Sequence, residues 1–288
     1  MVTVSEVSPA AARWADLARE LDCWGAEGRN AGLWWRDDDA AAPCERLDRL
    51  LAIARTAPVA LAVIPALAAP GLAAWLEASA ARADRSAPIA VLQHGWRHLD
   101  HAPRAATDRL LAKKSEFPAD RPGLTVAADL AAGRERLRAL FGGRALAVLA
   151  PPWNRFDDSF LPLLAGCGIG AISQVKPRAA AWPAPGVFAA NVHVDLVAWK
   201  EGRGFIGEAA ALGGLVGHLR ARRGGEADRD EPTGILTHHL VQDQATDEFL
   251  LRLLVLTLAH PAARWLDAGE VFAPGVGRSG IAASGISA

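Results

Sequence analysis

Short apolar runs alternate with segments of helical periodicity along most of this 288-residue chain. Most of these runs are apolar along their length, which is typical of strands buried on both faces of a parallel sheet, and the longest one alternates through its second half. We expect about seven such strands, over residues 33–35, 59–64, 89–93, 145–150, 169–173, 187–199 and 234–237. Helical spacing of apolar residues predicts helices over 14–25, 46–56, 72–82, 129–141, 159–165, 205–222 and 247–259. This alternation predicts an α/β fold in which parallel strands form a barrel similar to a TIM barrel.

No internal repeat or low-complexity linker divides the chain before its C-terminal segment. We predict an N-terminal helical extension over residues 1–30 and one barrel domain over residues 31–273. The remaining residues, 274–288, are rich in Gly, Ser and Ala, and this composition predicts a disordered tail.

Composition and charge exclude several classes of partner. The chain is 51% hydrophobic and 22% charged, which is ordinary for a soluble globular protein. Its net charge of −1 and the lack of a basic run argue against a nucleic-acid partner. The N-terminal segment lacks the apolar core of a signal peptide or membrane span, so we expect a cytoplasmic protein. The three cysteines are far apart and are expected to be reduced, buried thiols.

Three consecutive carboxylates follow the first predicted strand, in Trp34-Trp35-Arg36-Asp37-Asp38-Asp39. Charged groups next to a buried strand need a charge partner, and a metal ion would supply one. In α/β folds the C-terminal ends of parallel strands hold the active site. Asp37 is interpreted as a solvated residue or one that supports the metal ligands without contacting the ion.

His94 and His98 follow the third predicted strand at a spacing of four residues, which would place both imidazoles on one side of a helical turn. Together with Asp39 they provide the three nitrogen and oxygen ligands that a catalytic metal ion requires. The sequence therefore predicts one divalent ion held by Asp39, His94 and His98. Zinc suits this ligand set best, and cobalt, nickel, manganese and iron are alternatives.

Two further residues have the properties of an acid and a base. Asp38 adjoins the predicted ligand Asp39, so it is the candidate base for a metal-bound water. His238, after the last predicted strand, is the candidate acid that protonates a leaving amine. The adjacent His239 is the alternative acid.

These motifs resemble those of the polysaccharide deacetylase family, carbohydrate esterase family 4, in the family's order between residues 35 and 239. Asp38-Asp39 match its paired aspartates, and His94-Gly95-Trp96-Arg97-His98 match its His-x-x-x-His metal pair. The resemblance implies a distorted barrel of about seven βα units. It also assigns the metal site, the base Asp38 and the acid His238 of Leu236-Thr237-His238, which favours His238 over His239.

The resemblance also implies a substrate-binding set. Pro151-Pro152-Trp153 resemble the segment that borders the site and offers a backbone amide to an oxyanion, and residues 195–199 resemble the Asp-x-x-x-Trp segment. Indole rings suit the apolar faces of sugars. The predicted substrate-binding residues are Trp96, Pro152, Trp153, Arg155, Asp195 and Trp199.

The chain departs from the family pattern at several positions. The glycine after the paired aspartates is Ala40, and the threonine two positions before Asp38 is Arg36. The arginine that opens the third motif and pairs with the base is missing around Leu149-Ala150, so Arg155 or Arg36 would have to replace it. The aspartate that tunes the acid histidine is Ala198, and Asp195 is the candidate replacement.

The polar segment Lys113–Phe117, followed by Arg121, is interpreted as a solvated loop, with contact to substrate as the alternative.

Together these features predict a metal-dependent hydrolase that removes an acyl group, expected to be acetyl, from an N-acylated sugar or glycan precursor. The expected partner is a small-molecule or oligosaccharide substrate. Two alternatives remain: an amidohydrolase acting on a small non-sugar amide, and a barrel that binds carbohydrate or regulates without turnover. The missing motif arginine and Ala198 motivate the second alternative.

Overall fold

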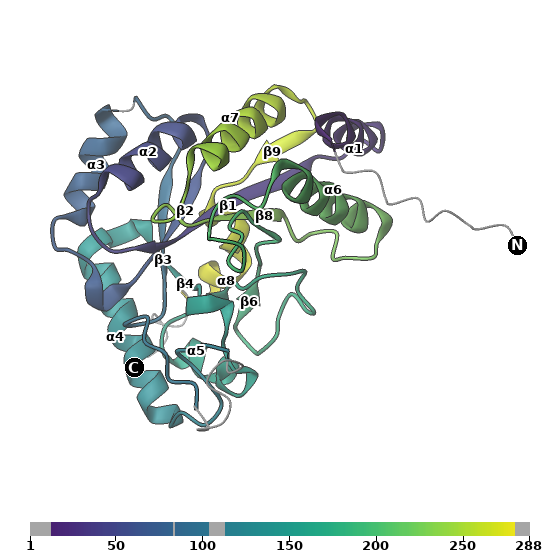
Figure 1. Ribbon diagram of the computed structural model, residues 1–288. Coiled ribbons are helices and arrows are strands. Elements are labelled where there is room, and N and C mark those ends of the chain that lie inside the picture. The colour runs from purple at the N-terminus through teal and green to yellow at the C-terminus, as the bar shows by residue number, and fades with distance from the viewer. Residues whose placement is uncertain (1–12, 83, 104–112, 280–288) are drawn as a thin grey trace, which may run out of the picture.

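The computed structural model describes residues 13–82, 84–103 and 113–279. Strands form a curled sheet with most of the helices on its outer side, and the N-terminal helix α1 (Trp14–Ala26) lies beside helix α6 (Glu208–Gly224) (Figure 1). No described helix combines the length and the apolar character that a membrane span requires.

Nine strands pair in one sheet across the described residues, and every ladder between them is parallel. The order is β6-β5-β4-β3-β2-β1-β8-β7, and β9 pairs with β1. The strands are β1 (Ala31–Ala40), β2 (Val59–Val63), β3 (Ile89–Gln93), β4 (Ala145–Leu149), β5 (Ala171–Ile172), β6 (Phe188–Ala189), β7 (Val194–Asp195), β8 (Thr233–Thr237) and β9 (Ala263–Trp265).

The two ends of this order, β6 and β7, follow one another in the chain with only four residues between them. So short a link requires the two ends of the sheet to lie close together. The sheet therefore curls into an incompletely closed barrel, which confirms the predicted distorted (β/α) barrel. Because all strands are parallel, their C-terminal ends meet at one rim of this barrel.

The remaining helices connect or flank these strands. They are α2 (Glu45–Ile53), α3 (Leu72–Arg82), α4 (Gly123–Phe141), α5 (Leu161–Gly166), α7 (Gln244–Ala259) and α8 (Ala268–Ser279). Short 3₁₀ helices occupy Ala54–Thr56, Pro65–Leu67, Gly142–Arg144, Pro152–Asn154 and Asp158–Phe160.

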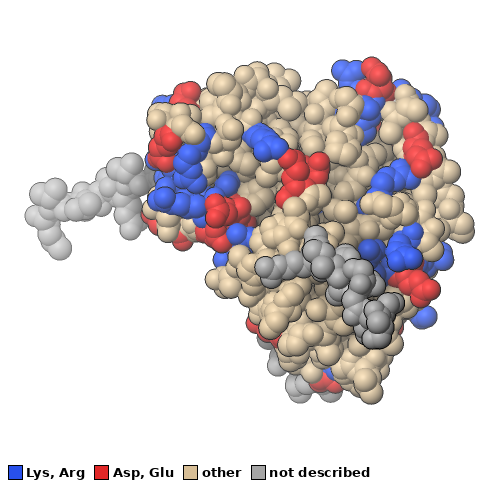
Figure 2. All heavy atoms as spheres, turned by 180° about the vertical axis from the view of Figure 1, so that it is seen from behind, with Lys and Arg blue, Asp and Glu red and all other residues tan. Residues whose placement is uncertain are grey.

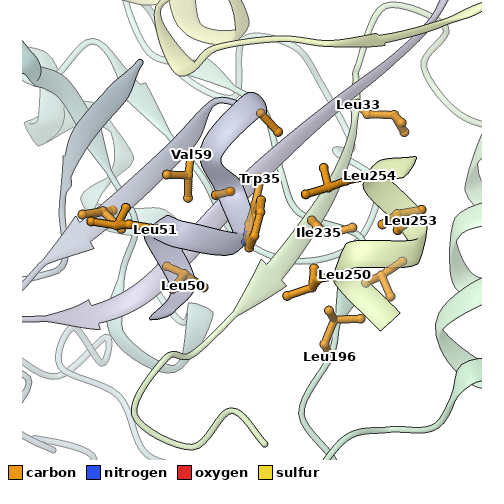
Figure 3. Packing of buried hydrophobic residues seen from close by; sticks show 14 of the residues in the cluster. Leu33, Trp35, Leu50, Leu51, Val59, Leu196, Ile235, Leu250, Leu253 and Leu254 are labelled. Carbon is orange, nitrogen blue, oxygen red and sulfur yellow. The ribbon is translucent and has the colours of Figure 1, made fainter. Parts of the chain in front are cut away.

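The main core lies between the sheet and its outer helices. Trp35 of β1 packs between leucines of α2 and leucines of α7 (Figure 3). Burial of such large side chains contributes about 2–3 kcal/mol each. This packing fixes β1 at the centre of the sheet, and β1 carries the three aspartates.

Local details differ from the predictions. The expected strand over 187–199 is two short strands at opposite ends of the sheet order, because the chain between them crosses the gap of the barrel. The aspartates lie within β1, which runs to Ala40, rather than after it. Helix α8 includes residues 274–279, which were assigned to a disordered tail, and residues 280–288 and 1–12 lie outside the described part.

Surface charge is mixed on the face turned away from Figure 1. Figure 2 shows Lys and Arg interspersed with Asp and Glu there, without a continuous basic stripe. This pattern agrees with the near-neutral net charge.

Candidate active site and metal centre

The residues predicted from the motifs converge at the C-terminal rim of the barrel. Asp38 and Asp39 come from the end of β1, His94 and His98 follow β3, and His238 follows β8. The Nε2 atoms of His94 and His98 lie 3.1 and 3.3 Å from Oδ1 of Asp39. Three potential ligand atoms from two strand ends therefore face one another.

The hydrogen bonding of His94 leaves its Nε2 available to bind an ion. Its Nδ1–H donates to the carbonyl of Ala150 at 2.8 Å, because a carbonyl oxygen can only accept. In the neutral ring the Nε2 lone pair then points at the Asp39 carboxylate, and a cation is needed between these two acceptors. The ligand set of two imidazoles and one carboxylate fits a divalent metal ion.

The pKa values of Asp39, His94 and His98 are shifted by their burial and by one another's charges. Burial would raise the pKa of Asp39, but the hydrogen bond and charges of the surrounding histidines hold it well below its usual range. Burial would lower the pKa of His94, but the charges of Asp38 and Asp39 raise it. Burial and the neighbouring His94 lower the pKa of His98. The pKa values of the two histidines are therefore shifted in opposite directions.

Backbone strain is concentrated around the same point. Asp39 and His98 have φ values of 73° and 57°, and Trp153 and Asn154 have φ values of 54° and 55°. Left-handed conformations of this kind are costly outside glycine and gather at functional sites. Four of the seven such non-glycine residues in the described part of the chain lie here.

Of the two candidates for the arginine missing from the third motif, Arg36 is the one that pairs with Asp38. Its Nε and Nη2 donate to the two carboxylate oxygens of Asp38 at 2.8 and 3.0 Å. Its Nη1 donates to the carbonyl and hydroxyl oxygens of Ser173 at 2.9 and 2.8 Å, and Nη2 also donates to Oδ1 of Asn154. The side chains of Arg36 and Asp38 are both buried. Arg155, the other candidate, donates instead to the carbonyl of Lys114 at 2.7 Å.

His238 lies on the other side of Asp38. Its Nε2 is 4.0 Å from Oδ2 of Asp38, and its Nδ1 is 3.9 Å from Oδ1 of Asp195. Asp195 accepts hydrogen bonds from Trp199 Nε1 at 2.8 Å and from the amide of Val197 at 3.0 Å. Burial raises the pKa of Asp195. The indole of Trp199 meets the His238 ring edge to face at 4.7 Å.

His239 belongs to a different, buried network. Asp37 accepts from Thr237 Oγ1 at 2.7 Å and from the amide of His239 at 3.0 Å, and the His239 ring Nδ1 lies 2.5 Å from its other oxygen. Asp37 is fully buried rather than solvated and ties β1 to β8. Because the His239 ring is paired with Asp37, His238 is the histidine that remains beside Asp38 and Asp195.

Two of the three predicted aromatic residues lie at the rim, and the third lines a separate cavity. Trp153 lies against the His98 ring at 4.3 Å, and Trp199 is 45% exposed beside His238, so both flank the rim. Trp96 lines a separate cavity of about 570 Å³ with Ala66, Leu67, Arg97, Leu99 and Arg136. Pro152 is buried next to Gly95.

Sequence reasoning missed Glu116. It was placed in a solvated loop, but its side chain is 1% exposed and accepts hydrogen bonds from the amides of Trp96 and Arg97, between the two metal-site histidines. Burial raises its pKa. The one available signal was the burial-prone Phe117 next to it; nothing in the sequence marked Ser173 or Asn154 as partners of Arg36.

A second group of possible ligands, His193, His218 and Glu231, lies at the opposite end of β7 and β8. Its hydrogen bonds do not suit a metal ion. Nδ1 of His193 accepts from the amide of Gly234 at 2.9 Å, so in the neutral ring Nε2 carries the proton and faces Glu231 at 3.4 Å. The two imidazole rings are stacked at 3.4 Å instead of converging on one point.

Comparisons with known proteins give a consistent picture of the fold. No family model and no curated protein matches the chain. A solved structure of a candidate polysaccharide deacetylase from Mycobacterium smegmatis matches with a TM-score of 0.53 and 16% identity, covering 95% of this chain and 96% of that one. The chain has the polysaccharide deacetylase fold.

Two further solved structures are similar at lower scores. A family 4 acetyl xylan esterase from Clostridium thermocellum, in complex with a cobalt ion, has a TM-score of 0.47 and 14% identity over 84% of this chain and 91% of that one. The peptidoglycan deacetylase PdaC from Bacillus subtilis has a TM-score of 0.44 and 12% identity over 86% and 93%.

Proposed function

We propose that this protein is a divalent-metal-dependent deacetylase that hydrolyses the amide of an N-acetylated sugar. The observation that carries the proposal is the arrangement around Asp38: it lies beside the Asp39, His94 and His98 group and is paired with Arg36, and His238 lies 4.0 Å away. An ion ligand set, a base and an acid thus surround one point at the rim.

Asp39, His94 and His98 are the proposed ligands of the ion, with zinc as the expected metal. When bound, the ion would polarise the amide carbonyl and lower the pKa of a water molecule. Nitrogen and oxygen ligands also accept cobalt, nickel, manganese or iron.

Asp38 is the proposed base that takes the proton from the attacking water. Arg36 serves this role because its two hydrogen bonds hold both oxygens of the Asp38 carboxylate in fixed positions. A base adjacent to a ligand carboxylate can reach a water held at the same point.

His238 is the proposed acid that donates a proton to the leaving nitrogen. Its Nδ1 is buried and has no hydrogen-bond partner among the described residues, and it faces the Asp195 carboxylate 3.9 Å away. Asp195 is therefore the proposed replacement for the aspartate absent at Ala198.

The aromatic rim favours a sugar over a small acyclic amide. Trp153 and Trp199 flank the two sides of the site, and flat indoles stack on the apolar faces of pyranose rings. Pro152 and Trp153 form the turn that the family resemblance assigns to oxyanion binding.

Acetate release from N-acetylglucosamine oligomers, with and without a chelator, tests the proposal. The matched variant is Asp38→Asn, which keeps the shape of the side chain but removes the base. We expect chelator-sensitive release by the wild-type protein, a loss of about 10²–10⁴-fold in the variant, and the same metal content in both. Release from a simple aryl acetamide but not from the oligomers would favour the non-sugar amidohydrolase. Metal binding without release from either substrate would favour a binding domain.

A further inference from the structure

The loop that joins His94 to His98 is held by a carboxylate from a distant part of the chain. Glu116 Oε2 accepts from the amide of Trp96 at 3.2 Å, and Oε1 accepts from the amide of Arg97 at 2.8 Å. Hydrogen bonds from amides to a carboxylate acceptor are stronger than those to a neutral one. A single side chain thus fixes both residues in the middle of this loop.

The fit between Glu116 and the loop is tight. A Cβ atom on Gly95 would lie 1.9 Å from Glu116 Oε2 and 2.8 Å from Pro152 Cγ and Cδ, and Gly95 has a φ of +61°. Only glycine allows this close approach. The backbone of the loop is therefore shaped around the carboxylate.

Glu116 is itself held in place from the side opposite the loop. Its carbonyl accepts from Arg121 Nη1 at 3.1 Å, and the carbonyl of the next residue, Phe117, accepts from the amide of Asp157 at 3.2 Å. The Phe117 ring packs edge-on against Phe156 at 5.3 Å. The carboxylate is thus a fixed point rather than a mobile side chain.

We propose that Glu116 is a positioning residue that holds the His94–His98 loop in its metal-binding geometry. It does not contact the ion and acts through the loop backbone. Groups that orient metal ligands in this way typically contribute about 10–100-fold to metal affinity. This inference rests on the metal site of the proposed function.

The chain offers a matched control at the other end of the barrel. Glu231 is also buried, and it accepts two backbone amides, from Arg178 at 2.9 Å and from Asn191 at 2.8 Å. Glu116→Gln and Glu231→Gln make the same chemical change, because a glutamine keeps one acceptor and turns an amide group toward the other N–H. Only the first change touches the metal-site loop.

The experiment is a titration of the metal-free proteins with Zn²⁺ and Co²⁺, together with their Tm values. We expect Glu116→Gln to weaken metal affinity about 10–100-fold, and Glu231→Gln to leave it within about 2-fold, although both lower Tm. If Glu116→Gln does not fold, Glu116→Asp replaces it, because the shorter side chain cannot reach both amides.

Equal affinity in wild type and the Glu116 variant would overturn the positioning role while leaving the proposed function intact. Equal weakening by both glutamate variants would show a general loss of stability and would also overturn it. A wild-type protein that binds neither metal would overturn the proposed function, and the role of Glu116 with it.

Discussion

Two groups of histidine and carboxylate side chains lie at opposite ends of the same barrel. The upper group, at the C-terminal rim, is Asp39, His94 and His98, and the lower group is His193, His218 and Glu231. Each has two imidazoles and one carboxylate with potential ligand atoms within 4.8 Å of one another. Residue type and proximity therefore do not separate them.

The two groups differ in the hydrogen bond made by Nδ1, the ring nitrogen that does not face the carboxylate. In the upper group Nδ1 of His94 donates to a carbonyl, which leaves Nε2 as a lone pair. In the lower group Nδ1 of His193 accepts from an amide, which places the proton on Nε2. The ring atom that could bind a metal is free in one group and protonated in the other.

The carboxylates and the surrounding charges differ as well. Both Glu231 oxygens accept hydrogen bonds from backbone amides. Burial lowers the pKa of His193, and the charges of Arg222 and Arg178 also act to lower it. In the upper group the guanidinium of Arg36 is paired with Asp38. These contacts support the proposal that the upper group binds a cation, whereas the lower group joins α6 to β7 and β8.

The largest expected effect comes from removing one histidine from each group. His98→Ala should abolish metal binding and lower acetate release by more than about 10³-fold, since the ion supplies several kcal/mol of transition-state stabilisation. His218→Ala should leave about one metal per chain, because we assign no ion to the lower group. Elemental analysis of both purified variants checks this. Metal lost from His218→Ala alone would reverse the assignment of the two groups.

A smaller effect is expected on the free energy of unfolding when an arginine is removed from either end of the barrel, Arg36 near the upper group or Arg178 near the lower group. Arg36→Met leaves Asp38 buried without a cation, and breaking a buried pair in this way costs about 3–5 kcal/mol. Arg178→Met frees Asp228, whose side chain is 32% exposed and can be hydrated, so its cost should be about 1–2 kcal/mol. Urea unfolding of the metal-free variants measures both. Equal losses would mean that the buried Arg36–Asp38 pair contributes no more to stability than the half-exposed Arg178–Asp228 pair.

Patterns in the sequence were sufficient to predict the barrel and the residues that meet at its rim. Parallel strands were indicated by apolar runs, and the motif residues follow or end those strands, so their convergence at the rim follows from topology. The roles of these residues stay predictions, because they depend on chemistry that proximity does not test.

Other features could not be predicted, because they depend on contacts between distant segments. The choice of Arg36 over Arg155 depends on Ser173 and Asn154, which come from two other strand ends. Within residues 187–199 the segments on both sides of the barrel gap are mostly apolar. Nothing in the sequence therefore indicates where one end of the sheet stops and the other begins. The burial of Glu116 likewise depends on a loop from another part of the chain.

The smallest expected effect is a pH dependence that belongs to the lower group. Burial, together with the charges of His193 and Arg222, lowers the pKa of His218 from 6.5 to about 2. The folded protein therefore binds fewer protons here than the unfolded chain. The contribution of His218 to stability is complete above pH 6.5 and is lost as pH falls from there toward 2.

Between pH 7 and 4.5 this single group should lower the free energy of unfolding by roughly 2–3 kcal/mol. His218→Gln removes the titrating ring but can still bond to Thr233 Oγ1, which lies 2.9 Å from Nδ1 in the wild type. Comparing wild type with this variant by urea unfolding at both pH values cancels the contributions of groups that do not contact His218. We expect the wild type to lose about 2–3 kcal/mol more than the variant. The same loss in both proteins would show that His218 is protonated or hydrated in the folded state. The lower group would then no longer differ from the upper group in excluding a cation.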